Sequence, residues 1–196
     1  MPVIDRLAIV GIGLIGSSVA RAAIAHDAAG SVTLYDASTS VRKRAGEIDL
    51  GEIADTLEDC VKDADLVILC TPVGVMGHIA EDMAPHLKQG AIVSDVGSVK
   101  SAVLEAVAPH IPSGVSFIPG HPISGTEKSG PDAGFATLFE GRWCIITPPD
   151  EHEDAASLDT LTRFWEALGS TVEIMSVSRH DRVLATALSF HPVKLI

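Results

Sequence analysis

Three glycines lie near the start of the chain with the spacing G-x-G-x-x-G, at Gly11, Gly13 and Gly16. Glycine at these positions permits a tight turn, lets the backbone approach a diphosphate closely, and lets the following helix pack against the preceding strand. The amides at the start of that helix, at Leu14 and Ile15, would then face the phosphates with the help of the helix dipole. The same spacing also occurs in turns that only pack a helix on a sheet, so the neighbouring elements must show whether the turn binds a phosphate.

An acidic residue stands where a dinucleotide site would need it. Asp36 ends the second expected strand, and a carboxylate there accepts hydrogen bonds from both ribose hydroxyls and repels a 2′-phosphate. We therefore expect NAD rather than NADP as the cofactor. Arg42 and Arg44 lie close enough in the sequence to leave NADP open, and the alternative to a cofactor site is a packing turn with a surface aspartate.

Two residues after a strongly apolar run are also placed for a ligand. Thr71 and Pro72 follow the run 66–70, so they should lie at the carboxyl edge of a parallel sheet, where ligands bind in this architecture. An ordinary strand-to-helix turn with proline near the first helical position would give the same pattern. We expect both residues to contact the cofactor.

The segment 119–130, PGHPISGTEKSG, combines turn-forming residues, hydroxyls and one imidazole. This composition suits a loop that holds polar groups against a ligand. His121 lies at the expected sheet edge and can reach a bound nicotinamide; because histidine titrates near neutrality, it could take a proton from an alcohol while hydride leaves the same carbon. The alternatives are a structural role for His121 and a helix N-cap for Ser98, which follows another expected strand. The other seven histidines are expected to be mostly surface residues.

The elements that must position these residues alternate between strand and helix. Apolar runs indicate strands at 7–10, 32–35, 66–70, 91–94, 115–118, 143–146 and 172–175, and helical patterns occupy 17–28, 41–47, 75–87, 101–108 and 155–168. This alternation predicts a Rossmann-type, doubly wound α/β fold, with a mostly parallel sheet and helices on both faces. A further helix begins near residue 179 and is expected to stop shortly after Pro192.

Composition narrows the classes of function. The 196 residues include 14 basic and 26 acidic side chains, and the formal net charge of −12 makes nucleic-acid binding a poor expectation. Three scattered cysteines (Cys60, Cys70 and Cys144) favour a reducing cytoplasm over a disulfide framework or a zinc cluster, and we expect no metal. The sequence has no run of about 18 apolar residues and no basic signal-peptide start, so we expect a cytoplasmic protein without a membrane segment.

Six segments together resemble the prephenate/arogenate dehydrogenase family, with the bacterial cyclohexadienyl dehydrogenases nearest in pattern. The likeness extends over nearly the whole chain up to Ala185, and its fourth segment discriminates far better than the glycine turn. The segments are VGIGLIGSSVARA (10–22), CTPVGVM (70–76), DVGSVK (95–100), GHPISGTEKSG (120–130), FEGRWCIITP (139–148) and SRHDRVLA (178–185).

The resemblance implies an NAD-dependent oxidative decarboxylation in tyrosine biosynthesis. Prephenate would give 4-hydroxyphenylpyruvate, or arogenate would give tyrosine, as hydride passes to NAD+, carbon dioxide leaves and the ring becomes aromatic. The family's catalytic histidine falls on His121, which would accept the proton of the ring hydroxyl. Its catalytic serine falls on Ser98, placed to bond that hydroxyl or the imidazole. Thr126 and Glu127 match positions at the substrate's side-chain end, where Glu127 could gate access, and Lys100 is interpreted as part of a structural ion pair.

The sequence departs from the family after Ala185. Family members continue with a helix bearing Ser-His-x-Pro-His and then a helical dimerisation domain, which provides an arginine for the ring carboxylate. Here the stretch reads SFHPV (189–193) and the sequence ends at Ile196, so both helix histidines are replaced and the arginine has no counterpart. We expect residues 1–178 to form an NAD-binding domain and residues 179–196 to begin a truncated helical domain. The homodimer is expected of the full-length family, whereas the oligomeric state of this chain stays open.

Two alternatives to the complete enzyme remain at this point. A dinucleotide-binding fragment without catalysis would follow from the missing helical domain, because a ring carboxylate left unpaired beside the cofactor is costly to bury. A β-hydroxyacid dehydrogenase would share the fold, although the segment 120–130 argues against it. The sequence does not separate prephenate from arogenate.

Overall fold

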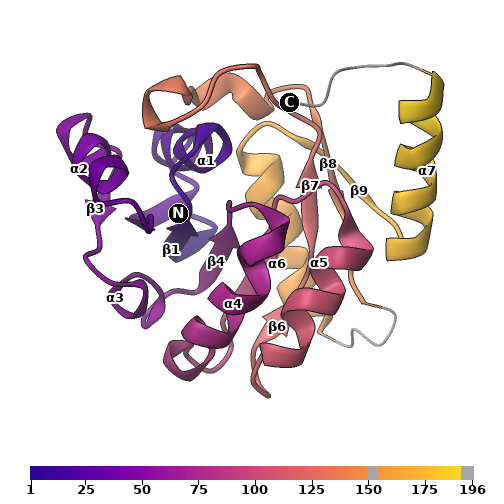
Figure 1. Cartoon of the computed structure of the whole chain (residues 1–196), viewed down its shortest axis with the longest axis horizontal. Helices are drawn as coiled ribbons and strands as arrows, with labels where there is room; N and C mark the ends of the chain where they lie inside the picture. Colours follow the sequence, from indigo (N-terminus) through magenta and orange to yellow (C-terminus); the bar gives the residue numbers. More distant parts are fainter. Residues whose placement is uncertain (150–153, 191–196) are drawn as a thin grey trace.

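A parallel sheet of six strands forms the centre of the molecule (Figure 1). The structure is a computed structural model, and it describes residues 1–149 and 154–190. The order of the strands reverses between β1 and β4, because the chain first moves outward from β1 and then returns to the other side of it. In spatial order the strands are β3 (Glu52–Ile53), β2 (Ala29–Tyr35), β1 (Ile4–Val10), β4 (Leu66–Leu69), β5 (Ile92–Asp95) and β6 (Ser116–Phe117).

Helices connect these strands and cover both faces of the sheet. The α-helices are α1 (Leu14–Ala25), α2 (Thr39–Glu47), α3 (Leu57–Val61), α4 (Val73–Met83) and α5 (Lys100–Val107), followed later by α6 (Ala155–Ala167) and α7 (Val177–Phe190). Short 3₁₀ turns lie at Ala84–His86, Ala108–His110, Pro131–Ala133 and Ala136–Phe139. None of the helices in the described part of the chain is both long and apolar enough to cross a bilayer.

The central strand β4 explains why the sheet is buried on both sides. Successive side chains of a strand point to opposite faces. Ile68 accordingly belongs to the cluster that contains Val19 of α1 and Phe164 of α6, whereas Val67 belongs to the cluster that contains Met76 of α4. A strand with a helix layer on each face needs apolar residues at every position, as the run 66–70 has.

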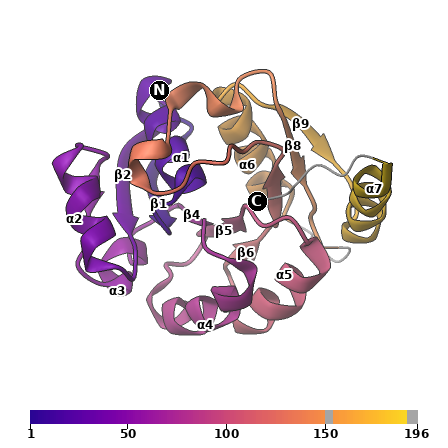
Figure 2. The ribbon, with the colours of Figure 1, turned by 45° about the horizontal axis from the view of Figure 1, so that its top comes forward.

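A second sheet of three strands stands beside the first. β7 (Gly120–Pro122) runs antiparallel to β8 (Trp143–Ile146), and β9 (Thr171–Ile174) runs parallel to β8. After β9 the chain enters α7, which contacts α5 and lies at the edge of the molecule (Figure 2). This sheet carries the segment 120–122 to the end of β5.

The predicted Rossmann-type fold is confirmed, and three local features differ from the expectation. The segment 120–122 forms a strand rather than a loop, because its backbone pairs with β8 although its own sequence has no apolar pattern. The strands at 143–146 and 172–175 belong to the second sheet rather than to the parallel one. The short elements β3 and α3 were not predicted. The expected end of the last helix near Pro192 lies outside the described residues.

Candidate active site

The glycine turn connects β1 to α1 and has an open space at its middle. A Cβ atom built on Gly11, whose φ is +100°, would lie 2.7 Å from the carbonyl oxygen of Cys70. One built on Gly16 would lie 2.0 Å from the carbonyl oxygen of Gly11. Only glycine fits at these two positions. A Cβ on Gly13, in contrast, would meet no atom within 4 Å, so the turn is closely packed except at Gly13.

The first turn of α1 keeps its backbone amides available. Gly13 is the N-cap residue and provides no side-chain cap, and the first turn contains no acidic residue. Within the described part of the chain, the amides of Leu14 and Ile15 have no hydrogen-bond acceptor. Free amides at a helix N-terminus carry partial positive charge and attract anions. The open space at Gly13 and these amides therefore suit a phosphate group.

Asp36 ties the end of β2 to the glycine turn. Its Oδ2 accepts a hydrogen bond of 2.9 Å from the amide of Ile12, and its Oδ1 accepts one of 2.9 Å from the amide of Ser38. The side chain is half-buried. Each carboxylate oxygen can accept a further hydrogen bond, so Asp36 can still receive two hydroxyl donors such as those of a ribose.

The two arginines that left NADP open are both engaged with other groups. Arg42 donates from Nη1 to the carbonyl oxygen of Asp36 at 2.6 Å, and its guanidinium lies 5.4 Å from the centre of the Tyr35 ring. Arg44 donates to both carboxylate oxygens of Asp132 and to Glu47. Neither guanidinium is therefore free for a 2′-phosphate, which favours NAD.

Thr71 brings an unpaired hydroxyl to the carboxyl end of β4. Its Oγ1 is buried and has no hydrogen-bond partner in the described part of the chain, and its methyl group would lie 2.9 Å from a Cβ on Gly11. Pro72 beside it is the N-cap residue of α4. A buried hydroxyl without a partner costs about 1–3 kcal/mol. A ligand with a polar atom at this point would remove that cost, so this position fits a bound dinucleotide.

A fully buried ion pair links β5, α5 and β7. Lys100 Nζ lies 2.5 Å from Asp95 Oδ2, and neither side chain is exposed. The same Nζ donates to the carbonyl oxygen of Gly120 at 2.5 Å, and the Gly120 amide donates to Asp95 Oδ1. Burial raises the pKa of Asp95 and lowers the pKa of Lys100, while each partner opposes that shift in the other. The interpretation of Lys100 as part of a structural ion pair is confirmed.

His121 follows this junction directly and is only 9% exposed. Burial, the Lys100 ammonium and His180 lower the pKa of His121 to about 3, against the opposing effect of Asp181. The expectation that His121 titrates near neutrality is therefore wrong, because the ring is desolvated beside a cation. The imidazole is neutral over the ordinary pH range. Its Nε2 has no partner among the described residues and is not sealed from solvent, so it can accept a proton.

Sequence reasoning missed His180, which contacts this imidazole, and Asp181, which contacts His180. His180 of α7 is fully buried, and its Nε2 lies 2.9 Å from His121 Nδ1. Its Nδ1 lies 2.8 Å from Asp181 Oδ1. The expectation that the other histidines are mostly surface residues fails at His180. The available signal was the adjacent His-Asp pair inside the segment 178–185.

The remaining predicted site residues lie on the surface. Ser98, Thr126 and Glu127 are exposed, and no hydrogen bond joins any of them to His121 in the part of the chain that the structure describes. Ser98 does not cap α5, because the N-cap residue is Val99. Beside this group, the Ser124 hydroxyl is buried without a partner in the described part of the chain. The roles assigned to Ser98, Thr126 and Glu127 stay predictions.

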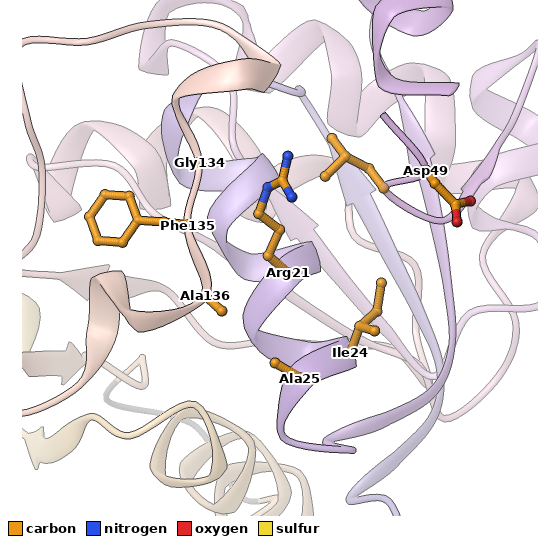
Figure 3. Close-up of a pocket in the computed structure, with 8 residues that line it drawn as sticks. Arg21, Ile24, Ala25, Asp49, Gly134, Phe135 and Ala136 are labelled. Atoms are coloured by element: carbon orange, nitrogen blue, oxygen red, sulfur yellow. The ribbon is translucent and has the colours of Figure 1, made fainter. Parts of the chain in front are cut away.

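One cavity of the structure lies apart from the candidate site residues. A cavity of about 450 Å³ lies between α1 and the segment 134–136, lined by Arg21, Ile24 and Phe135 among others (Figure 3). None of the predicted site residues lines it. Over residues 1–149 and 154–190, no three His, Cys, Asp or Glu side chains gather as they would around a metal ion.

Comparison with known families and structures gives a consistent result. The family model described as the nucleotide-binding domain of prephenate dehydrogenase matches residues 19–174. A cyclohexadienyl dehydrogenase of Zymomonas mobilis is 45% identical over 186 residues, which cover 94% of this chain and 63% of that protein. The chain thus spans less than two thirds of that relative.

Two solved structures share the fold along almost the whole chain. The crystal structure of prephenate dehydrogenase from A. aeolicus, in complex with hydroxyphenyl propionate and NAD+, has a TM-score of 0.84 and 31% identity, covering 95% of this chain and 68% of that one. The crystal structure of Synechocystis arogenate dehydrogenase has a TM-score of 0.83 and 31% identity, covering 92% of this chain and 63% of that one.

Proposed function

Because the chain belongs to the prephenate dehydrogenase family, whose nucleotide-binding domain it matches over residues 19–174, we propose that it binds NAD+ and oxidatively decarboxylates prephenate or arogenate. The observation that carries this proposal is the position of His121. The buried pair Asp95–Lys100 holds the preceding residue against the carboxyl end of β5. That end lies on the same edge of the parallel sheet as the glycine turn after β1.

The cofactor part of the proposal rests on five features of the chain. The diphosphate would lie at Gly13 and the free amides of Leu14 and Ile15, and the ribose hydroxyls would donate to Asp36. Thr71, with its unpaired hydroxyl, and Pro72 would line the cofactor at the end of β4. Gly11 and Gly16 would shape the turn without touching the ligand through side chains. The engaged arginines favour NAD over NADP.

The chemistry divides between the cofactor and the chain. When bound, NAD+ accepts hydride from the ring carbon that bears the hydroxyl, and aromatisation with loss of carbon dioxide supplies the driving force. The neutral His121 accepts the hydroxyl proton at Nε2. Ser98 would bond the same hydroxyl, and Thr126 and Glu127 would line the substrate's side-chain end. The assigned roles of these three residues rest on their match to the family's motifs.

The second candidate is dinucleotide binding without turnover. The features that would hold NAD+ are shown by the described residues themselves, whereas the roles of Ser98, Thr126 and Glu127 rest on motif matches alone. We propose residues 1–178 as the NAD-binding domain and residues 179–196 as the start of a helical domain; residues 191–196 lie outside the described part. A cytoplasmic location and a homodimer of the longer family members belong to the same proposal.

Calorimetry and turnover together test the proposal. We expect NAD+ to bind the full chain more tightly than NADP+, and NADH to form when prephenate or arogenate is added. The variant His121→Ala should bind NAD+ as before and lose turnover. NAD+ binding without turnover would favour the second candidate, and turnover that survives His121→Ala would refute the role of this histidine.

A further inference from the structure

Three titratable side chains form a continuous hydrogen-bonded line into the candidate active site. Asp181 Oδ1 lies 2.8 Å from His180 Nδ1, and His180 Nε2 lies 2.9 Å from His121 Nδ1. The two imidazole rings are 5.2 Å apart at their centres and inclined by 63°. His180 is fully buried and His121 is 9% exposed, so the contact between the two rings is shielded from water.

The far end of this line is fixed by the start of α5. Asp181 Oδ1 accepts a hydrogen bond of 3.0 Å from the amide of Lys100, and Oδ2 accepts bonds of 2.9 and 2.5 Å from the amide and hydroxyl of Ser101. Burial at this junction raises the pKa of Asp181, but the donors from Ser101 and His180 outweigh it, so its pKa lies well below the usual range. Asp181 is thus an ionised carboxylate that replaces a side-chain cap on α5.

An ionised carboxylate at one end determines where the protons lie along the line. A carboxylate only accepts hydrogen bonds, so His180 Nδ1 must carry a proton. When the His180 ring carries only this proton, its Nε2 is an acceptor, and His121 Nδ1 donates to it. A neutral His121 that carries its proton on Nδ1 has a free lone pair on Nε2. This is the tautomer that can accept a proton from a hydroxyl.

The charges around His121 explain why this arrangement is needed. The titratable groups near it are Lys100 of the buried ion pair, Cys144 of β8, and His180 and Asp181 of α7. Lys100 and His180 disfavour a positive charge on His121, and Asp181 favours one. Without Asp181, a proton accepted at Nε2 would create an imidazolium beside an ammonium in a desolvated site.

We propose that Asp181 and His180 are positioning residues for His121. They hold its imidazole in the Nδ1–H tautomer, orient it, and offset the positive charge that forms when Nε2 accepts the proton. The inference rests on the proposed function in so far as the proton comes from the substrate's ring hydroxyl. The tautomer itself is a property of the chain and can be measured without any substrate. Removing one member of such a line leaves the reacting histidine in place but in the wrong tautomer.

The test measures tautomer and turnover in the same set of full-length variants. Long-range ¹H–¹⁵N correlation spectra of ¹⁵N-labelled protein, recorded without cofactor, report which ring nitrogen of His121 carries the proton. We expect Nδ1–H in the unmodified chain. In His180→Phe, which keeps a planar ring but removes both nitrogens, we expect a mixture of tautomers, a fall in kcat of about 100-fold or more, and an unchanged Kd for NAD+. Asp181→Asn should also give a mixture of His121 tautomers and a lower kcat. It replaces His180→Phe in the test if that variant does not fold.

A matched control separates this effect from the loss of any histidine–carboxylate pair. His86 Nδ1 lies 3.7 Å from Glu58 Oε1 in a partly exposed pair away from the site, and His86→Phe should change neither the His121 spectrum nor kcat. An Nε2–H signal for His121 in the unmodified chain, or a tautomer unaffected by both variants, would overturn the inference. A fixed Nδ1–H tautomer in a chain without turnover would support the positioning role and count against the proposed function alone.

Discussion

The glycine turn and the histidine line, which consists of Asp181, His180 and His121, lie at the same edge of the parallel sheet, but they are built from different groups. The glycine turn is backbone from one continuous segment, between the end of β1 and the first turn of α1, and it works because side chains are absent. The histidine line consists of side chains from separate segments. It joins β7 to α7 and is anchored at the start of α5.

This difference determines how each region can fail. At the glycine turn a new side chain can remove the ligand site while the fold survives, because the space at Gly13 is empty of protein atoms. Around the histidine line, the Lys100 ammonium both joins α5 to β7 and lowers the pKa of His121. A substitution there is therefore expected to change the stability of the fold as well as the chemistry of the site. The following predictions test this contrast.

The largest expected effect comes from breaking the buried ion pair. Lys100→Met leaves the Asp95 carboxylate buried without its partner and removes the donor to the Gly120 carbonyl. Breaking such a pair from one side costs about 3–5 kcal/mol of unfolding free energy. Urea unfolding, followed by tryptophan fluorescence, measures the loss. The double variant Asp95→Asn/Lys100→Met should recover part of it, and a loss below about 1 kcal/mol would show that the pair does not hold this junction.

The same contrast shows which parts could be predicted from the sequence. The glycine turn, Asp36 and the doubly covered strand β4 were predictable, because each depends on neighbours in the sequence or on an unbroken apolar run. β7 was not, because Gly-His-Pro has no strand pattern and becomes a strand only by pairing with β8. The contact of His180 with His121 spans 59 positions, so the adjacent His-Asp pair in the sequence does not by itself indicate which residue His180 meets. Likewise, the first turn of α5 has no local side-chain cap, and the amide of Ser101 donates instead to Asp181, 80 residues away in the sequence.

A second prediction concerns acid stability. The folded chain keeps His121 neutral down to a pKa of about 3, whereas the unfolded chain protonates it near 6.5. Below pH 6.5 the unfolded state therefore binds one proton more than the folded state, and stability falls by about 1.4 kcal/mol per pH unit from this residue. Between pH 6 and pH 4, we expect the unmodified chain to lose about 2–3 kcal/mol more than His121→Asn does.

Unfolding curves at several pH values measure this difference. His78→Asn is the control, since His78 is exposed on α4 and its removal should leave the pH dependence as it is. Parallel pH dependences for the unmodified chain and His121→Asn would contradict the neutral state assigned to His121. The glycine turn contains no comparable titratable group, so this effect is specific to the histidine line.

The third prediction tests the glycine turn. Gly13→Ala places a methyl group in the open space without meeting protein atoms, and the φ of −85° at this position suits alanine. We expect the Kd for NAD+ to rise about 30-fold or more, equivalent to about 2 kcal/mol, with an unfolding free energy within about 1 kcal/mol of the unmodified chain. Gly46→Ala in α2 is the matched control: its Cβ meets only Ile53 at 3.8 Å, and NAD+ affinity should not change. Equal affinities for Gly13→Ala and Gly46→Ala would remove the phosphate site from this turn.

The smallest expected effect is on cofactor choice. Asp36→Ser removes the carboxylate that would receive the ribose hydroxyls but keeps a side chain that can accept from the Ile12 amide. We expect NAD+ to bind about tenfold more weakly, which corresponds to about 1.4 kcal/mol, and NADP+ to gain only slightly, because Arg42 remains held by a backbone carbonyl and by Tyr35. Asp63→Ser removes the same charge from an exposed pair with Arg6, so it controls for the net charge of −12. If both variants changed the ratio of NAD+ to NADP+ affinity equally, the preference would come from the overall acidity of the chain. A change confined to Asp36→Ser would assign it to the end of β2.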